Sequence, residues 1–324
     1  MHFKNLAQAL IVALLISATA FSQKSAGIYL EILRAEDELR YDAAIEKLLR
    51  HSDERIRVRA VLAAGRIVDE AAIPLLASIL EKDRSEQARA MAAFALGEIE
   101  SIAAADVILK TLREADIPAA IRSRAAEAAG KIAAANADNE SAKKLGEAIL
   151  DTLEAEDQKG EKQDVGTVLL ALTAALRARA PETDFITAKF LTNRNARIRA
   201  DAANTLGRIR ATNANDTLRE MLASDADPIA RANAARALGA ANDKDAGEIL
   251  LRAATADVDL RVRVSAIRAA AQINYADAAA PLLNRGNRLL EIFRQKAKPG
   301  LISAEKNELL EIASALGRLL TGTS

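Results

Sequence analysis

The stretch RADAANTLGRI at Arg199–Ile209 shares its pattern with five other stretches of the chain. Each begins with an arginine, and each has a glycine or an alanine eight residues later. The other five stretches are RVRAVLAAGRI at 57–67, RAMAAFALGEI at 89–99, RSRAAEAAGKI at 122–132, RANAARALGAA at 231–241 and RVSAIRAAAQI at 263–273. A pattern that returns at a fixed interval is typical of a repeat protein.

The spacing of these arginines gives the length of one repeat unit. Arginines 57, 89 and 122 follow one another at 32 or 33 residues, and so do arginines 199, 231 and 263. The gap of 77 residues between Arg122 and Arg199 is long enough for one more unit. The apolar stretch 165–176 predicts its second helix, with Asp164 at about the place of the arginine. A period near 32 residues predicts an all-α solenoid of about eight helical hairpins.

Each unit is predicted to contain two helices, with the arginine near the start of the second. The predicted first helices are amphipathic stretches at 43–49, 72–80, 103–112, 142–153, 215–222 and 246–253. Four residues before the arginine, five of the six units have aspartate, serine or asparagine, which cap helix N-termini well. The sixth unit has Pro118 there, and we expect Asp116 to replace the cap.

Small residues occupy fixed positions of the second helix. Alanine lies five residues before the glycine position in every unit. The glycine position itself holds Gly65, Gly97, Gly130, Gly207, Gly239 and Ala271. A glycine inside a helix costs about 1 kcal/mol relative to alanine, so its recurrence predicts helices that cross too closely for a side chain. We therefore expect these positions to form a packing seam between units.

This pattern resembles the HEAT-repeat superfamily, in particular the short HEAT-like units of bilin lyases, over residues 40–320. The resemblance implies the fold but no single function, because that family includes scaffolds, adaptors and a few enzymes. It also implies that the recurring arginine pairs with an aspartate or asparagine in a ladder of hydrogen bonds between adjacent loops. The residues six positions before an arginine are Asp83, Asp116, Asn193, Asp225 and Asp257.

A different face of the second helix varies from unit to unit. It consists of the positions six before, three before and one after the glycine position, and we call it the second-helix face. In a solenoid this face lines the concave surface, where an extended partner usually binds. The alternative is an ordinary solvated face, but apolar residues among charges favour protein or peptide binding. The predicted binding residues are Arg59, Leu62, Arg66, Phe94, Glu98, Arg124, Glu127, Lys131, Asp201, Asn204, Arg208, Arg236 and Arg268.

Two segments depart from the regular repeat. Residues 155–164 are strongly polar and predict a long loop that bends the array or forms a mobile flap. Residues 284–295 and 304–320 predict a longer final helix pair, joined through Lys298-Pro-Gly300. The last helix is apolar on more than one side. We therefore expect further chain, a partner or a second copy of the chain to cover it, so that self-association is possible.

The composition argues against several classes of function. Lys and Arg total 45, as do Asp and Glu, so no net field attracts nucleic acid or anionic lipid. The chain has no cysteine, and its 2 histidines are His2 and His51, which excludes thiolate chemistry and multi-histidine metal sites. There is no Gly-rich phosphate loop and no nucleophile with a nearby base. We expect neither enzymatic activity nor a cofactor.

The N-terminus has the pattern of a signal peptide over residues 1–22. A short basic region with Lys4 precedes the apolar run 10–16, and small residues follow at Ala18, Ala20 and Ser22. The alternative is a membrane anchor, but the apolar run is short for a bilayer span. We expect export to the periplasm or the extracellular space, with a repeat array over 28–324 and no membrane span after cleavage. A cysteine-free chain suits such an oxidising compartment.

A second resemblance concerns exported bacterial peptidylprolyl isomerases of the cyclophilin type. It rests on ILRAEDELR at 32–40 and AMAAFALGEI at 90–99. In those proteins a HEAT-like array precedes a cyclophilin-type barrel, whereas this chain has no β-rich segment and no Phe-His-Arg motif. The sequence therefore favours an exported scaffold that binds a protein or peptide. The alternative is the non-catalytic binding arm of such an isomerase.

Overall fold

The computed structural model of the protein describes residues 26–296 and 304–321, which contain helices and no strands. The chain divides into two compact units, residues 1–148 (unit 1) and 149–324 (unit 2). The division falls within helix α8 (Glu140–Gln158). The predicted signal peptide lies outside the described residues. None of the described helices is long and apolar enough to cross a membrane.

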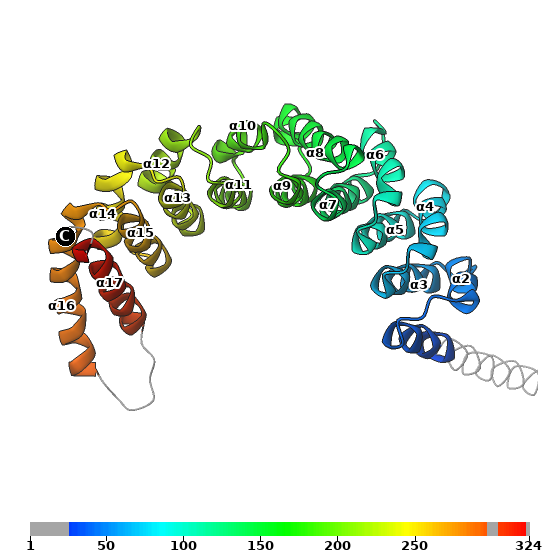
Figure 1. The fold of residues 1–324 in the computed structure, drawn as a ribbon, viewed down its shortest axis with the longest axis horizontal. Helices are drawn as coiled ribbons and strands as arrows, with labels where there is room; N and C mark the ends of the chain where they lie inside the picture. Colours follow the sequence, from blue (N-terminus) through cyan, green and yellow to red (C-terminus); the bar gives the residue numbers. More distant parts are fainter. Residues whose placement is uncertain (1–25, 297–303, 322–324) are drawn as a thin grey trace, which may run out of the picture. The chain divides into compact units, whose positions relative to one another are not determined.

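Unit 1 contains three complete pairs of helices. Residues 26–37 are helical and precede the first pair. The pairs are α2 (Ala43–Leu49) with α3 (Glu54–Ile67), α4 (Ile73–Lys82) with α5 (Glu86–Ile99), and α6 (Ala105–Arg113) with α7 (Ala119–Ala135). The second helices α3, α5 and α7 pack on one another in order, as Figure 1 shows.

Unit 2 continues the same alternation of first and second helices. It contains the end of α8, then α9 (Val165–Ala178), α10 (Thr183–Ala188) with the 3-10 turn η4 (Lys189–Thr192), α11 (Ala196–Ile209), α12 (Asn215–Ser224), α13 (Pro228–Ala240), α14 (Gly247–Ala256), α15 (Leu260–Gln272), α16 (Ala279–Lys296) and α17 (Ala304–Thr321). Helices α9, α11, α13, α15 and α17 pack in sequence. Taken in order, α2 to α17 make eight first-and-second-helix pairs, which confirms the predicted all-α solenoid.

The glycine positions form a close-packed seam between second helices. A Cβ atom added to Gly65 would lie 2.7 Å from the Cα of Ala95, and one added to Gly97 would lie 2.7 Å from the Cα of Ala128. In unit 2 a Cβ on Gly207 would lie 3.0 Å from the Cα of Ala237. Each glycine thus meets the alanine two residues before the next glycine position. The predicted packing seam is confirmed.

Side-chain caps begin most of the second helices as predicted. The side chains that accept hydrogen bonds from first-turn N–H groups are Asp53, Ser85, Asn195, Asp227 and Asp259. Helix α7 has no side-chain cap at Pro118, so the expectation that Asp116 replaces it was wrong. Asp116 lies two residues before the cap position, whereas the working caps lie at that position itself.

The irregular unit has a different register from the one predicted. Asp164 caps α9 and accepts a hydrogen bond of 2.7 Å from the Thr167 N–H. It therefore occupies the cap position, and Val168, which is buried, takes the place of the arginine. Arg179, just after α9, has the left-handed backbone that follows the second helix in other units. The prediction that Asp164 replaces the arginine was off by one helical turn.

The polar segment 155–164 is not a long loop. Helix α8 continues to Gln158, and the 3-10 turn η3 (Gly160–Lys162) follows almost at once. Glu156 is buried and accepts hydrogen bonds of 2.6 Å from Lys159 Nζ and 2.7 Å from the Asp164 N–H. The predicted long loop was therefore wrong. That this segment bends the array or moves as a flap stays a prediction.

The final helix pair is present, and α16 begins five residues earlier than predicted. The predicted connector Lys298-Pro-Gly300 lies outside the described residues. In α17, Leu310 and Leu320 are 57% and 62% exposed, and a Cβ on Gly317 would meet nothing within 4 Å. The described part of the chain therefore leaves this face of α17 uncovered. That further chain, a partner or a second copy covers it stays a prediction.

Several second helices end in a residue with a left-handed backbone, three positions after the glycine position. These residues are Val68, Glu100, Arg179, Arg210, Asn242 and Asn274, with φ between 49° and 59°. Asparagine adopts this conformation readily, but for a β-branched residue it is a strained outlier. Valine at this position therefore stores strain that asparagine would relieve.

We expect Val68→Asn to raise the free energy of unfolding by about 1 kcal/mol, because the left-handed backbone is costly for valine. Val68 is 54% exposed, so little packing is lost. The reverse change, Asn242→Val, should lower the free energy of unfolding by a similar amount. Urea denaturation of both variants measures this, and a Val68→Asn protein no more stable than the wild type would contradict the strain.

Candidate functional site

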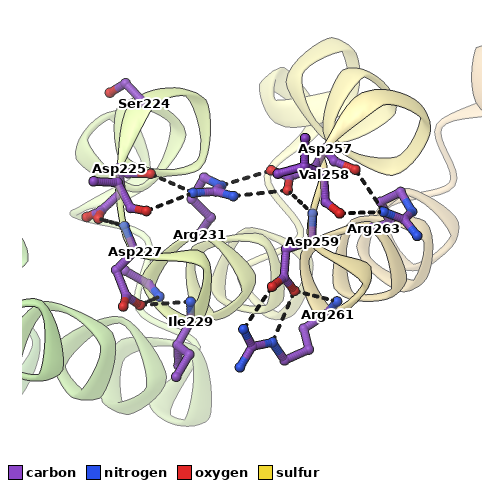
Figure 2. Close-up of polar contacts among 12 residues, drawn as sticks. Ser224, Asp225, Asp227, Ile229, Arg231, Asp257, Val258, Asp259, Arg261 and Arg263 are labelled. Atoms are coloured by element: carbon purple, nitrogen blue, oxygen red, sulfur yellow. Dashed lines mark hydrogen bonds and ion pairs between the residues drawn. The ribbon is translucent and has the colours of Figure 1, made fainter. Parts of the chain in front are cut away.

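The recurring arginines are used up by the fold, as Figure 2 shows for Arg231. Its Nε and Nη2 donate to the Asp257 carboxylate at 2.8 and 3.0 Å, and its Nη1 donates to the carbonyl oxygens of Asp225 and Ala226 at 2.8 and 3.3 Å. Arg231 thereby joins the loop before its own helix to the loop of the next unit. Its guanidinium has no edge left for a ligand.

The same arrangement repeats in both units. The equivalent pairs are Arg57 with Asp83 and Arg199 with Asp225, at 2.7 to 2.9 Å, and Arg263 pairs instead with Glu308 of α17. There are two exceptions. Arg89 donates to the carbonyl oxygen of Leu80 at 2.8 Å rather than to Asp116, and Arg122 donates instead to the carbonyl oxygens of Glu114 and Ala115 before its own helix, at 3.0 and 2.7 Å. The predicted ladder is therefore confirmed for Asp83, Asp225 and Asp257. It was wrong for Asp116, and for Asn193, whose side chain pairs with Gln163 instead.

Each ladder aspartate also orders its own loop. Asp257 accepts from the Asp259 N–H at 2.8 Å, as Asp225 does from the Asp227 N–H (Figure 2). Burial tends to raise the pKa of Asp257, but the hydrogen bonds from Arg231 and from the Asp259 N–H lower it, and the net pKa lies below the ordinary 3.8. The carboxylate is thus held ionised in a structural role.

The predicted binding residues fall into two groups, one in each unit. In unit 1 they are Arg59, Leu62 and Arg66 on α3, Phe94 and Glu98 on α5, and Arg124, Glu127 and Lys131 on α7. In unit 2 they are Asp201, Asn204 and Arg208 on α11, Arg236 on α13 and Arg268 on α15.

The basic residues of the unit 1 group are paired within the unit. Arg59 and Arg66 both form ion pairs with Glu36, which lies in the helical residues 26–37. Lys131 pairs with Glu98 and with Glu127, at 3.1 Å for the second pair. These contacts neutralise most of the positive charge that the sequence places on this face.

Phe94 is covered rather than exposed. The guanidinium of Arg124 lies 5.4 Å from its ring centre, and Lys131 Nζ lies 4.7 Å from it. Phe94 is therefore half-buried. Leu62 is half-buried as well, and the expectation of exposed apolar residues on this face was wrong. Burial tends to raise the pKa of Glu127, but Arg124 and Lys131 lower it to a net value below 4.5. Phe94, Arg124, Glu127 and Lys131 therefore pack on one another between the repeats.

The unit 2 group is more open. Asn204, Arg208, Arg236 and Arg268 are all exposed. Asp201 forms an ion pair of 3.0 Å with Arg197, and Arg268 pairs with Glu311 of α17 at 2.7 Å. Neither Arg208 nor Arg236 forms an ion pair with any residue that the structure describes. This face therefore carries positive charge that the fold does not neutralise.

The sequence analysis missed two carboxylates, Glu36 and Glu311, that pair with basic residues of the second-helix face. Glu36 precedes the first repeat, so it has no equivalent position in the other repeats. Glu311 lies six residues before Gly317 and thus on the second-helix face of α17. Extending the repeat alignment to the last helix would have found it. The predicted face also includes Asn233 and Ser265, which the structure buries.

No group of three or more His, Cys, Asp or Glu residues in the described ranges is arranged to hold a metal ion. A surface hollow of about 280 Å³ lies between α15 and α17, lined by Arg268, Gln272, Glu311 and Arg318 among others. Its volume lies just below the range of about 300 to 1,000 Å³ that is usual for small-molecule sites.

A family model of HEAT repeats matches residues 73–159, 183–271 and 215–297, which together make up more than half of the chain. The chain belongs to the HEAT-repeat family. The matched HEAT repeats contain the seam glycines 97, 207 and 239 and most of the arginine ladder. No curated protein sequence matches the chain significantly.

Several solved structures are similar to this chain at low sequence identity. The E. coli protein YibA is 18% identical over 92% of this chain and 97% of its own, with a TM-score of 0.63. The CpcE–CpcF complex of the Nostoc phycocyanin lyase is 19% identical over 85% and 93%, with a TM-score of 0.45. Human deoxyhypusine hydroxylase is 22% identical over 76% and 99%, with a TM-score of 0.30. Of these three, YibA alone has a TM-score above 0.5, and that similarity concerns the fold alone.

Proposed function

We propose that this HEAT-repeat protein is an exported scaffold that binds a protein or peptide on the second-helix face of unit 2. One observation carries the proposal. The ladder arginines of α11, α13 and α15 are consumed by structural hydrogen bonds. Arg208 and Arg236, in contrast, are exposed on the second-helix face and have no carboxylate partner among residues 26–296 and 304–321. An uncompensated charged surface on a rigid array is a feature that folding alone does not require.

The proposal places binding in unit 2 rather than evenly along the array. In unit 1 the corresponding cations are held by Glu36, Glu98 and Glu127. Reversing those charges would place carboxylates against carboxylates and disturb the packing of α3, α5 and α7. Binding through unit 1 would therefore require these ion pairs to break first.

Export is the second part of the proposal. It is supported by the signal-peptide pattern of residues 1–22 and by the absence of cysteine from the sequence. The resemblance to the binding arm of an exported isomerase stays a prediction. A scaffold of this kind needs no catalytic group in its repeats.

Site-specific cross-linking tests the proposed function. A photoreactive amino acid at position 204, on the exposed face of α11, should capture a discrete protein from an envelope extract. The matched control is the same amino acid at position 220. This position is exposed on α12, the first helix of the repeat that follows α11. Equal capture from both positions, or capture from neither, would contradict binding on the second-helix face.

A further inference from the structure

Arg236 of α13 is held differently from the ladder arginine of the same helix. Its Nε donates to Ser265 Oγ at 3.1 Å, and its Nη1 donates to Asn233 Oδ1 at 2.6 Å. Both acceptors are neutral, whereas Arg231 has a carboxylate. Its Nη2 donates to no residue in the described parts of the chain. The guanidinium is thus oriented by the protein without being neutralised.

The two acceptors are themselves fixed in place. Asn233 is 6% exposed and Ser265 is 3% exposed. The amide nitrogen of Asn233 donates to the carbonyl oxygen of Ala200 on α11 at 2.7 Å, which leaves its carbonyl oxygen directed at Arg236. Buried polar groups are costly unless they are hydrogen-bonded, so Asn233 and Ser265 are expected to keep their hydrogen bonds to Arg236. These bonds give the Arg236 guanidinium a defined orientation. A pre-oriented guanidinium loses less freedom when it binds an anion.

The surroundings of Arg236 favour an added negative charge. Burial and the neighbouring Arg268 both lower the pKa of Arg236 from 12.5. The charge of Arg268 is already shared with Glu311. Arg208, on the same face of the adjacent helix α11, is exposed and adds a second positive charge. A carboxylate between or beside these arginines would therefore relieve repulsion as well as form hydrogen bonds.

The spacing of the helices suggests how the charges of a partner are arranged. Neighbouring packed helices lie about 10 Å apart, and an extended peptide in the polyproline II conformation rises about 3.1 Å per residue with three residues per turn, so that every third side chain lies on the same side. Side chains of a peptide that crosses α11 and α13 would therefore reach successive arginines about every third residue. Arg236 and Arg208 would be the first two contacts.

We propose that the second-helix face of unit 2 binds an extended acidic segment of a partner protein, with Arg236 as the pre-oriented receptor for one of its carboxylates. This inference rests on the proposed function, because it names the chemistry of the partner that the scaffold holds. Asn233 and Ser265 act as positioning residues for Arg236. Arg208 receives a second carboxylate farther along the segment.

The direct test is a titration of the purified protein with a fluorescein-labelled peptide, followed by fluorescence anisotropy. The peptide has glutamate at every third position in a Gly-Ser background, and the control peptide has glutamine there. The acidic peptide should bind, with an affinity that falls as salt is added, and the glutamine peptide should not. Equal binding of the two peptides would overturn the proposal.

Three variants assign the binding to Arg236. Arg236→Gln should weaken the acidic peptide by about tenfold, because a charge-assisted hydrogen bond is lost. Ser265→Ala keeps the charge and should weaken binding by about threefold through lost orientation. Arg252→Gln removes an exposed positive charge from the first helix α14 and is the matched control, which should bind as the wild type does. Equal losses for Arg236→Gln and Arg252→Gln would show a non-specific charge effect and overturn the proposal.

Two further outcomes separate this inference from the function on which it rests. If position 204 still captures a partner but Arg236→Gln binds the acidic peptide as well as the wild type, the scaffold function stands and the acidic-segment proposal fails. If a single-stranded oligonucleotide binds in place of the peptide and is lost in Arg236→Gln, the partner class is wrong. Urea denaturation of each variant confirms that the folded proteins are being compared.

Discussion

Replacing Gly97 by leucine should lower the free energy of unfolding by about 3 kcal/mol or more, because overpacking then forces backbone shifts. Even a single Cβ at this position would lie 2.7 Å from the Cα of Ala128 on the next second helix. That neighbour is backbone and cannot rotate away. Helices α5 and α7 would have to separate, and urea denaturation followed by circular dichroism measures the cost.

A series of alanine substitutions is the sharper control. At Gly317 a Cβ meets nothing within 4 Å, so Gly317→Ala should gain up to about 1 kcal/mol from helix propensity alone. At Gly207 the nearest contact is 3.0 Å, and Gly207→Ala should lie between Gly317→Ala and Gly97→Ala. If all three variants gained stability equally, the glycine positions would not be a packing seam.

Removing a ladder arginine should have an effect of similar size. The side chains of Arg231 and Asp257 are only 13% and 11% exposed. Arg231→Leu would leave that carboxylate and two loop carbonyl oxygens without their partner. We expect the free energy of unfolding to fall by about 3 kcal/mol. This is the low end of the range for breaking a buried ion pair, because some solvent reaches the site. Arg261→Leu, which removes the exposed partner of Asp259 (Figure 2), should change stability little.

The same pairs set the response to acid. The pKa values of Asp83, Asp225 and Asp257 all lie below 3.8. Burial tends to raise them, but hydrogen bonds from arginine and from loop N–H groups lower them by more than burial raises them. The unfolded chain therefore binds more protons than the native state at low pH. The stability from these groups is present above about pH 4 and is lost as the pH falls through the native pKa values. In Arg231→Leu the guanidinium no longer lowers the pKa of Asp257, so the part of the stability that is lost on acidification should be smaller than in the wild type.

The parts of the fold that repeat could be predicted from the sequence. The alanine and glycine positions recur in most units, so the seam around Gly97 could be predicted without any structure. The ladder partner of Arg231 could be inferred in the same way, because Asp257 recurs at a fixed offset. The register of the irregular unit was misassigned because Val168 replaces the arginine, although Asp164 at the cap position still marks the register. Helix α10 was missed because it is six residues long and continues as a 3-10 turn.

The candidate site was harder to predict, because it depends on contacts across neighbouring repeats. The cover that Arg124 and Lys131 provide for Phe94 comes from side-chain conformations on the next second helix. The sequence shows an aromatic among charges, and it does not show that the charges lie on the ring. Equally, nothing in the sequence separates Arg236 from Arg59. Only the structure shows that one has neutral acceptors and the other a carboxylate.

The central claim is that stability and binding reside on different sides of the same second helices. Arg231 and Arg236 lie on one helix, α13, and provide the most direct test. The measurement is a titration of the folded Arg231→Leu and Arg236→Gln proteins with the acidic peptide. We predict that Arg236→Gln loses about tenfold in affinity, whereas Arg231→Leu, although less stable, binds as the wild type does. Equal losses of affinity in the two folded variants would contradict the claim.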